Sequence, residues 1–312
     1  MKASVQHLFD DQLATWETIR NSYDALTQVK EKALDVNGYI YKVQFNPARI
    51  VSSAAKVDDK SIRERKCFLC PNNLRSEQKR IAFNGHYSIL VNPFPVFPRH
   101  YTVAEQKHTK QSILSRFSDM LDLAKGLDDC VIFYNGPKCG ASAPDHAHFQ
   151  AGNKGFLPIE KDWRNLRTKE IATCGKAALW VSDDSPYVAL LIESTDDADA
   201  IELVHRICDA LEIQSDDDND EPMMNVLTWY DEDSWKICIF PRAKHRPSCY
   251  FAEGNGNMLI SPASVDLGGV FIIPRENDFN NITAADMATI LKEVCMSPSD
   301  LRKLVQQIKE RL

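Results

Sequence analysis

The sequence predicts an α+β fold made of two related halves, with a shared antiparallel sheet and flanking helices. Apolar runs of strand length alternate with amphipathic segments of helical period along the chain. The second half repeats the order of the first: helix, strand pair, proline break, strand, helix. No repeat of individual residues accompanies this order. We place the first half at residues 1–155 and the second at residues 156–312.

Helical spacing and period-two alternation place the elements of the first half. The predicted helices span residues 3–34 and 111–127, and the predicted strands span residues 38–52, 87–92, 101–105 and 131–134. The proline-rich stretch Pro93–Pro98 separates two of these strands. Because proline cannot donate to a strand ladder, this stretch predicts an extended turn.

The second half carries the same kinds of signal. The predicted strands span residues 178–181, 187–192, 224–230 and 235–240, and the predicted helices span residues 197–211, 283–295 and 298–311. The last two strands flank the polar Asp231–Ser234 and therefore predict a hairpin.

Composition limits the class of protein. A chain of 312 residues with 44% hydrophobic and 26% charged residues is typical of a globular enzyme. The net charge of −7 argues against extended nucleic-acid or anionic-membrane binding, which needs a broad basic face. No apolar run reaches the roughly 20 residues of a spanning helix, and the N-terminus lacks a signal-peptide core. Nine cysteines, an odd number and mostly scattered, favour a reducing compartment, so we expect a cytoplasmic protein.

The segment from Asn135 to Gly152 carries the strongest functional signal. His146, His148 and Gln150 occupy alternate positions, so in a strand all three share one face. The preceding loop, Asn135–Asp145, contains glycine, proline and serine, which allow backbone N–H groups to approach an anion. The alternative is a strand edge with two hydrogen-bonded structural histidines.

A second signal is Cys67-Phe-Leu-Cys70 followed by Pro71. Two thiolates at this spacing can bind one tetrahedral metal ion, and histidines elsewhere in the chain could complete a Cys2His2 set. The alternative is a pair of free thiols in a loop.

His146-Ala-His148-Phe-Gln150 after a Gly/Ser/Pro loop resembles the active-site signature of the transferase branch of the histidine-triad superfamily. The stretches Leu90–His108 and Ser264–Arg275 are also similar to that branch. The resemblance implies a histidine-triad-like fold and a nucleotidyltransferase. It assigns His148 as the nucleophile that forms a covalent nucleotidyl intermediate, and Gln150 as a hydrogen-bond donor to phosphoryl oxygens.

The same resemblance implies contacts to the substrate and a structural zinc ion. Residues Asn135, Gly140 and Ser142 of the loop are candidate substrate contacts. The other ring nitrogen of His148 needs an acceptor, for which we expect the backbone near Asn135 or Gly136. The implied metal ligands are Cys67, Cys70, His108 and His146, with His100 as the alternative to His108.

Two basic positions remain open between a role in binding and a surface role. Arg49 could reach a ligand phosphate or form a surface ion pair. The segment Arg242–Arg246 could bind phosphate or form an exposed basic turn.

The resemblance predicts a phosphorylase or nucleotidyltransferase that acts on a nucleoside diphosphate sugar or a dinucleoside polyphosphate. Phosphate or a sugar phosphate would be the acceptor. The alternatives are a hexose-1-phosphate uridylyltransferase and a non-catalytic nucleotide-binding protein. The sequence leaves the base, the sugar and the formation of a homodimer open.

Overall fold

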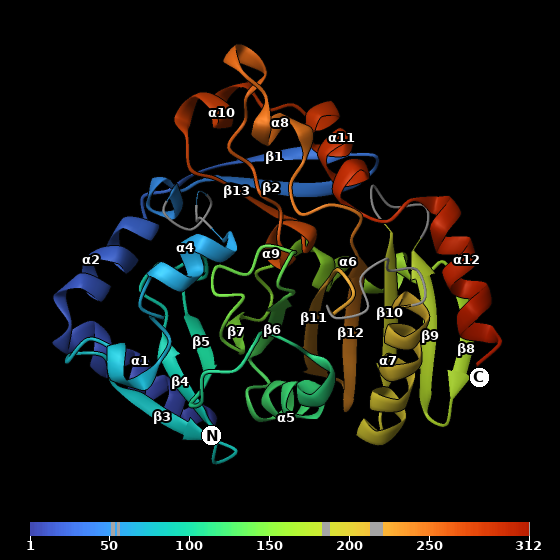
Figure 1. Cartoon of the computed structure of the whole chain (residues 1–312), viewed down its shortest axis with the longest axis horizontal. Helices are drawn as coiled ribbons and strands as arrows, with labels where there is room; N and C mark the ends of the chain where they lie inside the picture. Colours follow the sequence, from blue (N-terminus) through green and yellow to red (C-terminus); the bar gives the residue numbers. More distant parts are fainter. Residues whose placement is uncertain (51–53, 55–56, 183–187, 213–220, 312) are drawn as a thin grey trace.

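The computed structural model describes residues 1–50, 54, 57–182, 188–212 and 221–311, and it is built on a ten-stranded sheet (Figure 1). The strands lie in the order β3-β4-β5-β7-β6-β11-β12-β10-β9-β8, and every neighbouring pair is antiparallel. They are β3 (Arg80–Phe83), β4 (Tyr87–Val91), β5 (His100–Glu105), β6 (Cys130–Asn135), β7 (His148–Asn153), β8 (Lys169–Cys174), β9 (Ala177–Ser182), β10 (Ala189–Ser194), β11 (Met224–Asp231) and β12 (Ser234–Pro241). The predicted α+β class is confirmed.

The two halves of the sheet have the same topology. The first half runs β3-β4-β5-β7-β6 and the second runs β8-β9-β10-β12-β11, so in each half the last strand inserts between the third and the fourth. A helix precedes the fourth strand in both, α5 (Phe117–Gly126) and α7 (Asp197–Glu212). The halves join where β6 pairs with β11. The two related halves are thus confirmed, while a division near residue 155 stays a prediction.

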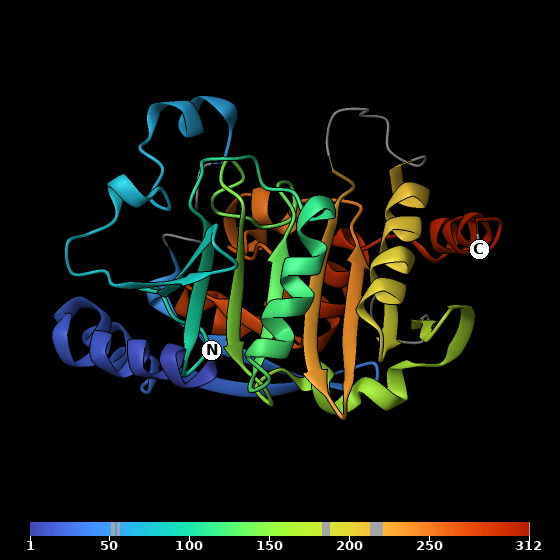
Figure 2. The ribbon, with the colours of Figure 1, turned by 90° about the horizontal axis from the view of Figure 1, so that it is seen from below.

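Layers of helix and strand cover both faces of the sheet (Figure 2). Along β6, Ile132 and Tyr134 face one core and Val131 and Phe133 face the other. Because both faces are buried, the strands are continuous apolar runs. The first core contains α1 (Lys2–Thr15), α2 (Glu17–Leu26), α5, α7 and α12 (Pro298–Lys309). The second contains α6 (Pro158–Leu166), α9 (Ser264–Leu267), α10 (Glu276–Asn281), α11 (Ala284–Val294) and a small sheet.

That small sheet joins the two ends of the chain. It consists of β1 (Lys30–Val36), β2 (Tyr39–Phe45) and β13 (Val270–Ile273), and β2 pairs with β13 in parallel. The predicted helix over 3–34 is therefore wrong in its second part. The chain turns extended at Trp16, which separates α1 from α2, and it becomes a strand at Lys30.

The strand predicted over residues 38–52 ends at Phe45, where β2 gives way to a short 3-10 helix, and residues 51–52 lie outside the described ranges. The remaining predicted elements lie close to their expected places. The proline-rich link Pro93–Pro98 is an irregular connection between β4 and β5, and β11 and β12 form the expected hairpin. Tyr187, where we predicted a strand to begin, lies outside the described residues. Short helices complete the chain: α4 (Asp59–Glu64), α8 (Ser248–Phe251), η1 (Pro47–Arg49), η2 (Pro71–Asn73), η3 (Leu114–Arg116) and η4 (Gly254–Gly256). Within the described ranges, none of the helices combines the length and apolar character needed to cross a membrane.

Candidate active site

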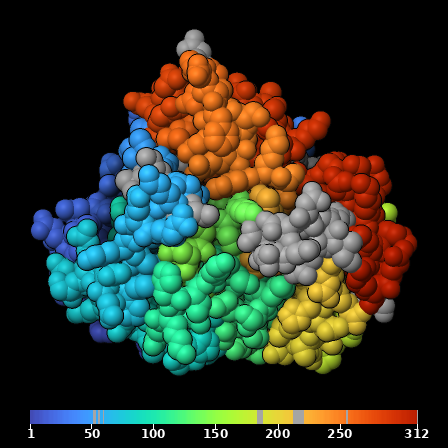
Figure 3. Space-filling model, viewed as in Figure 1, coloured from blue at the N-terminus to red at the C-terminus, as the bar shows by residue number. Residues whose placement is uncertain are grey.

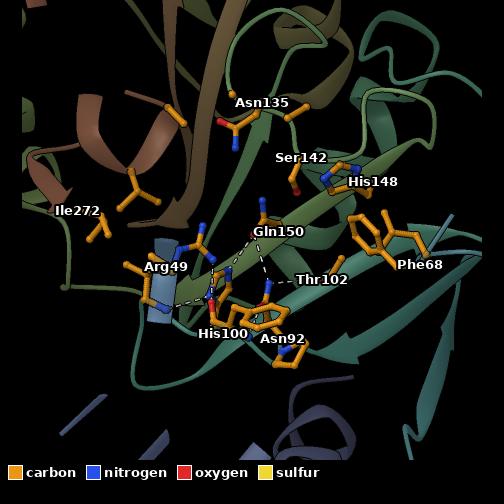
Figure 4. Close-up of a pocket in the computed structure, with 18 of the residues that line it drawn as sticks. Arg49, Phe68, Asn92, His100, Thr102, Asn135, Ser142, His148, Gln150 and Ile272 are labelled. Carbon is orange, nitrogen blue, oxygen red and sulfur yellow. Dashed lines mark hydrogen bonds between the residues drawn. The ribbon is translucent and has the colours of Figure 1, made fainter. Parts of the chain in front are cut away.

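A cavity of about 770 Å³ opens beside β7 and β5, between the first half of the sheet and the C-terminal segment (Figure 4). It brings together all six residues that we predicted as catalytic or substrate-binding: Arg49, Asn135, Gly140, Ser142, His148 and Gln150. The opposite wall includes Asp266 and Ile272. Figure 3 shows how α4 and the segment after it lie beside the C-terminal layer on this side of the molecule. A cavity of this size can hold a nucleotide.

His148 is the first residue of β7 and is 6% exposed. Its Nδ1 lies 2.8 Å from the carbonyl oxygen of His146. Since a carbonyl only accepts, Nδ1 carries the proton and donates it, which leaves the lone pair on Nε2. Burial lowers the pKa of His148 to about 4, so the ring is neutral at pH 7. The acceptor that we expected near Asn135 or Gly136 is therefore wrong, since the carbonyl of His146 fills that role.

Asn135 ends β6 and presents an amide to the cavity. Its Oδ1 accepts from Asn225 Nδ2 at 2.8 Å and from the backbone N–H of Ser264 at 3.0 Å. With the oxygen held by two buried donors, the NH2 group is left to face the cavity. Gly140 follows in the same loop with φ of +94°, and a Cβ there would lie 2.7 Å from that of Ala263. Glycine is thus required for the loop to pack against α9.

Cys67, Cys70, His108 and His146 converge, and their ligand atoms all lie within 4.8 Å of one another. The Cys67 Sγ–His146 Nδ1 distance is 3.3 Å and the Cys70 Sγ–His108 Nδ1 distance is 3.2 Å. Ligands of a tetrahedral zinc ion stand about 3.3–3.8 Å apart, given Zn–S and Zn–N bonds of about 2.3 and 2.0 Å. The donor set fits a metal ion with no coordination position left over.

The side chain of His146 points toward this cluster, away from the cavity. Strand β7 begins after it, and its Nε2 lies 2.6 Å from the carbonyl oxygen of Glu105, which directs Nδ1 at the two sulfurs. Burial opposes ionisation of Cys67, but His146 and nearby N–H groups outweigh it and lower the pKa of the thiol. The prediction that three alternate side chains share one face holds for His148 and Gln150 only.

Family models cover both halves of the chain. Residues 8–153 match "Domain of unknown function (DUF4922)", and residues 166–312 match "GDPGP1-like, C-terminal domain". Diadenosine 5',5'''-P1,P4-tetraphosphate phosphorylase 2 of Saccharomyces cerevisiae is 25% identical over 271 residues, which are 78% of this chain and 79% of the yeast protein. These matches support the resemblance of the motif from His146 to Gln150 to the transferase branch of the histidine-triad superfamily.

Solved structures show that the chain shares the fold of a yeast Ap4A phosphorylase. Yeast Ap4A phosphorylase Apa2 in complex with Ap4A has a TM-score of 0.64 at 17% identity, covering 95% of this chain and 98% of that one. The same enzyme in complex with AMP has a TM-score of 0.61 at 19% identity, covering 93% and 94%. The histidine-triad-like fold predicted from the motif is therefore confirmed.

Part of the cavity is built from residues that lie far from the motif in the sequence. Arg49 Nη1 donates to the carbonyl oxygen of Phe94 at 2.9 Å, and the side chain lines the cavity near Asp266. Burial lowers the pKa of Arg49 to about 10 and raises that of Asp266 to about 6. The guanidinium thus stays charged at neutral pH beside the cavity.

The basic segment Arg242–Arg246 divides between two roles. Arg242 is buried and donates to Asn225 Oδ1. Asn225 in turn donates to Asn135 Oδ1, so Arg242 supports the orientation of Asn135 indirectly. His245 and Arg246 line the cavity. The alternative of an exposed turn therefore holds for Ala243 and Lys244, whereas Arg242 is buried and His245 and Arg246 are half-buried.

No sequence pattern pointed to Gln111, which links the ends of β6 and β7. Its Nε2 donates to the carbonyl oxygens of Asn135 at 3.0 Å and His148 at 3.1 Å, and its Oε1 accepts from the His148 N–H at 2.8 Å. It lies in the linker before α5, where an isolated glutamine resembles a surface residue. It is 3% exposed.

Replacement of Gln111 by Leu is expected to lower the free energy of unfolding by about 2–4 kcal/mol, because it leaves three buried backbone groups without partners. Urea denaturation measures the change. Gln106→Leu is the control, since the side chain of this exposed glutamine donates only to Tyr87 O, at 3.3 Å, among the described residues. Equal small effects of both substitutions would contradict this linking role of Gln111.

Proposed function

We propose that this protein is a nucleotidyltransferase of the phosphorylase type, acting on a nucleoside diphosphate sugar or a dinucleoside polyphosphate. The match of its second half to a GDPGP1-like domain and its similarity to a yeast Ap4A phosphorylase support this class. Phosphate or a sugar phosphate is the proposed acceptor. The single observation that carries the proposal is the ring of His148, held through Nδ1 in a cavity of nucleotide size.

The proposed reaction has two displacements at one phosphorus atom. In the first, the Nε2 lone pair of His148 attacks the α-phosphorus, the P–O bond to the leaving phosphate breaks, and its electron pair leaves with that oxygen. In the second, an acceptor phosphate oxygen attacks the same phosphorus and the electron pair of the P–N bond returns to Nε2. One difficult displacement is thereby split into two.

The groups around His148 suit a phosphoryl group with negative charge. Asn135 presents an amide NH2 group, Gln150 a second amide, and Ser142 a hydroxyl, all lining the same cavity. Donors aimed at non-bridging oxygens stabilise the charge that develops at phosphorus. Arg49 and Arg246 lie on the same cavity and would bind the more distant phosphate.

Zinc is the metal that we propose for the cluster of Cys67, Cys70, His108 and His146. With four protein ligands its role would be structural. The carbonyl of His146 accepts from His148, so bracing His146 also braces the nucleophile. His100, the alternative fourth ligand, lies in the cavity wall instead.

The test is intact-mass spectrometry after brief incubation with GDP-mannose, GDP-galactose, UDP-glucose, ADP-glucose or diadenosine tetraphosphate, with phosphate withheld. We expect an acid-labile nucleotidyl adduct with at least one donor, released as a nucleoside diphosphate when phosphate is added. An adduct that is released by hexose 1-phosphate but not by phosphate would favour a uridylyltransferase-type reaction. Nucleotide binding without adduct or turnover would contradict the proposal.

Replacement of Gln150 by Leu is expected to lower kcat by about 10²- to 10³-fold. Removal of one preorganised hydrogen-bond donor to a developing anion typically has an effect of this size. Steady-state kinetics with the best donor measures it. Gln44→Leu is the matched control, because Gln44 is a buried glutamine of β2 that bonds to Glu31 and is not among the residues lining the cavity. A comparable loss of kcat in the control would sink the assignment.

A further inference from the structure

His100 is the first residue of β5, and its ring lies in the cavity wall at 1% exposure (Figure 4). It packs against Phe97 and Phe133, with ring centroids 5.5 and 5.7 Å away. It belongs neither to the metal cluster nor to the proposed reaction steps. A buried, fixed imidazole beside the candidate site calls for a role of its own.

The tautomer of His100 follows from its two neighbours. The backbone N–H of Val96 donates to Nδ1 at 3.2 Å, so Nδ1 carries the lone pair. Nε2 therefore carries the proton and donates it to Gln150 Oε1 at 3.0 Å. Burial and the charge of Arg49 lower the pKa of His100 to about 3, so the ring stays neutral.

A second donor points at the same oxygen. Asn92 Oδ1 accepts from the Phe94 N–H at 2.8 Å, which turns its Nδ2 toward Thr102 Oγ1 at 3.0 Å and toward Gln150 Oε1 at 3.5 Å. A flipped Gln150 amide would set its own NH2 group against two donors. The orientation with Oε1 toward His100 is thus fixed, and the NH2 group is directed to the other side, toward Asn135 and His148 (Figure 4).

We propose that His100 is the positioning residue that fixes the Gln150 amide as a donor in the cavity. Gln150 then meets the phosphoryl oxygens with N–H groups only, and it does so before any ligand binds. This arrangement favours a fully ionised phosphoryl group and avoids reorienting the amide in the transition state. The kinetic part rests on the proposed function, whereas the orientation of the amide does not.

The orientation is tested by ¹⁵N NMR of protein labelled at histidine, with the His100 signals assigned by their loss in His100→Leu. We expect an unprotonated Nδ1 and a protonated Nε2 at pH 7. In Gln150→Leu the Nε2 proton should exchange faster with water, since its acceptor is gone. A proton on Nδ1, or a charged ring, would overturn the inference, whether or not the protein turns over any donor.

The positioning role is tested by a double-mutant cycle of His100→Leu and Gln150→Leu, followed through kcat. We expect His100→Leu alone to lower kcat about ten- to hundredfold, and to add less than about twofold in the Gln150→Leu background. If His100 were only structural, His100→Leu would lower kcat by the same factor in the wild-type and Gln150→Leu backgrounds. That result would refute the positioning role. If the wild-type protein itself showed no turnover, the proposed function would be refuted. The NMR result would then decide the orientation of the amide by itself.

Tyr23→Phe serves as the control for damage to β5. The Tyr23 hydroxyl lies 3.0 Å from the carbonyl oxygen of His100, and its removal leaves the imidazole in place. We expect a lower melting temperature but a His100–Gln150 coupling of unchanged size. If the coupling disappeared in the Tyr23→Phe background, it would depend on the position of β5 and not on the His100 ring.

Discussion

His148→Ala is expected to lose the covalent intermediate entirely and to lower kcat on the order of 10⁴- to 10⁶-fold, because no other group can replace a nucleophile. The bond from His148 Nδ1 to the His146 carbonyl orients the ring and so places Nε2. Alanine has neither ring nitrogen. Intact-mass spectrometry with each donor measures the adduct, and a phosphate-dependent assay measures turnover.

The variant must also be shown to fold and to bind. Circular dichroism and the affinity for the nucleotide product should change little, because the contacts proposed for Asn135 and the loop remain. His86→Ala is a matched control, since His86 is an exposed histidine that pairs with Asp119 on the surface. Turnover retained by His148→Ala, or lost in His86→Ala, would rule out the mechanism.

Cys70→Ser is expected to lose the bound metal and to lower the free energy of unfolding by more than about 4 kcal/mol, a range reached when a structural metal is lost. Cys70 Sγ lies close to both histidines, 3.2 Å from His108 Nδ1 and 3.6 Å from His146 Nδ1. The measurements are zinc content by elemental mass spectrometry and urea unfolding with and without a chelator. Kinetic losses should accompany the loss of zinc, because His146 also holds the His148 ring.

Cys174→Ser provides the comparison, because this partly exposed cysteine lies on β8 at the far edge of the sheet. It should retain both zinc and stability. An unchanged zinc-to-protein ratio in Cys70→Ser would contradict the proposed metal site. The absence of bound metal in the wild-type protein would contradict it as well.

Local patterns predicted the parts of the site that lie within one short segment. Cys67 and Cys70 stand three residues apart, and His148 and Gln150 stand two apart on one strand, so spacing alone places each pair together. The apolar runs likewise predicted β6, β11 and β12, because strands buried on both faces leave a strong signal.

What sequence could not predict depends on the register between distant segments. Gln111, Asn225 and Ser264 reach the motif only because β5, β7, β6 and β11 lie side by side in one sheet. Helical spacing in residues 3–34 was misleading, because pairing of β1 with β2 overrides the local preference after Lys30. We expected His146 to share a face with His148 and Gln150. This was wrong because β7 begins at His148, so His146 lies before the strand and does not follow its alternation.

The parallel pairing of β2 with β13 brings an early segment of the chain together with one that is synthesised much later. Strand β7 is synthesised well before β13, yet the cavity wall near Arg49 includes Asp266 and Ile272, which lie far downstream of β7 in the chain. A nascent chain therefore contains His148 before the opposite wall of its cavity exists, and the proposed reaction requires that the C-terminal half has also folded.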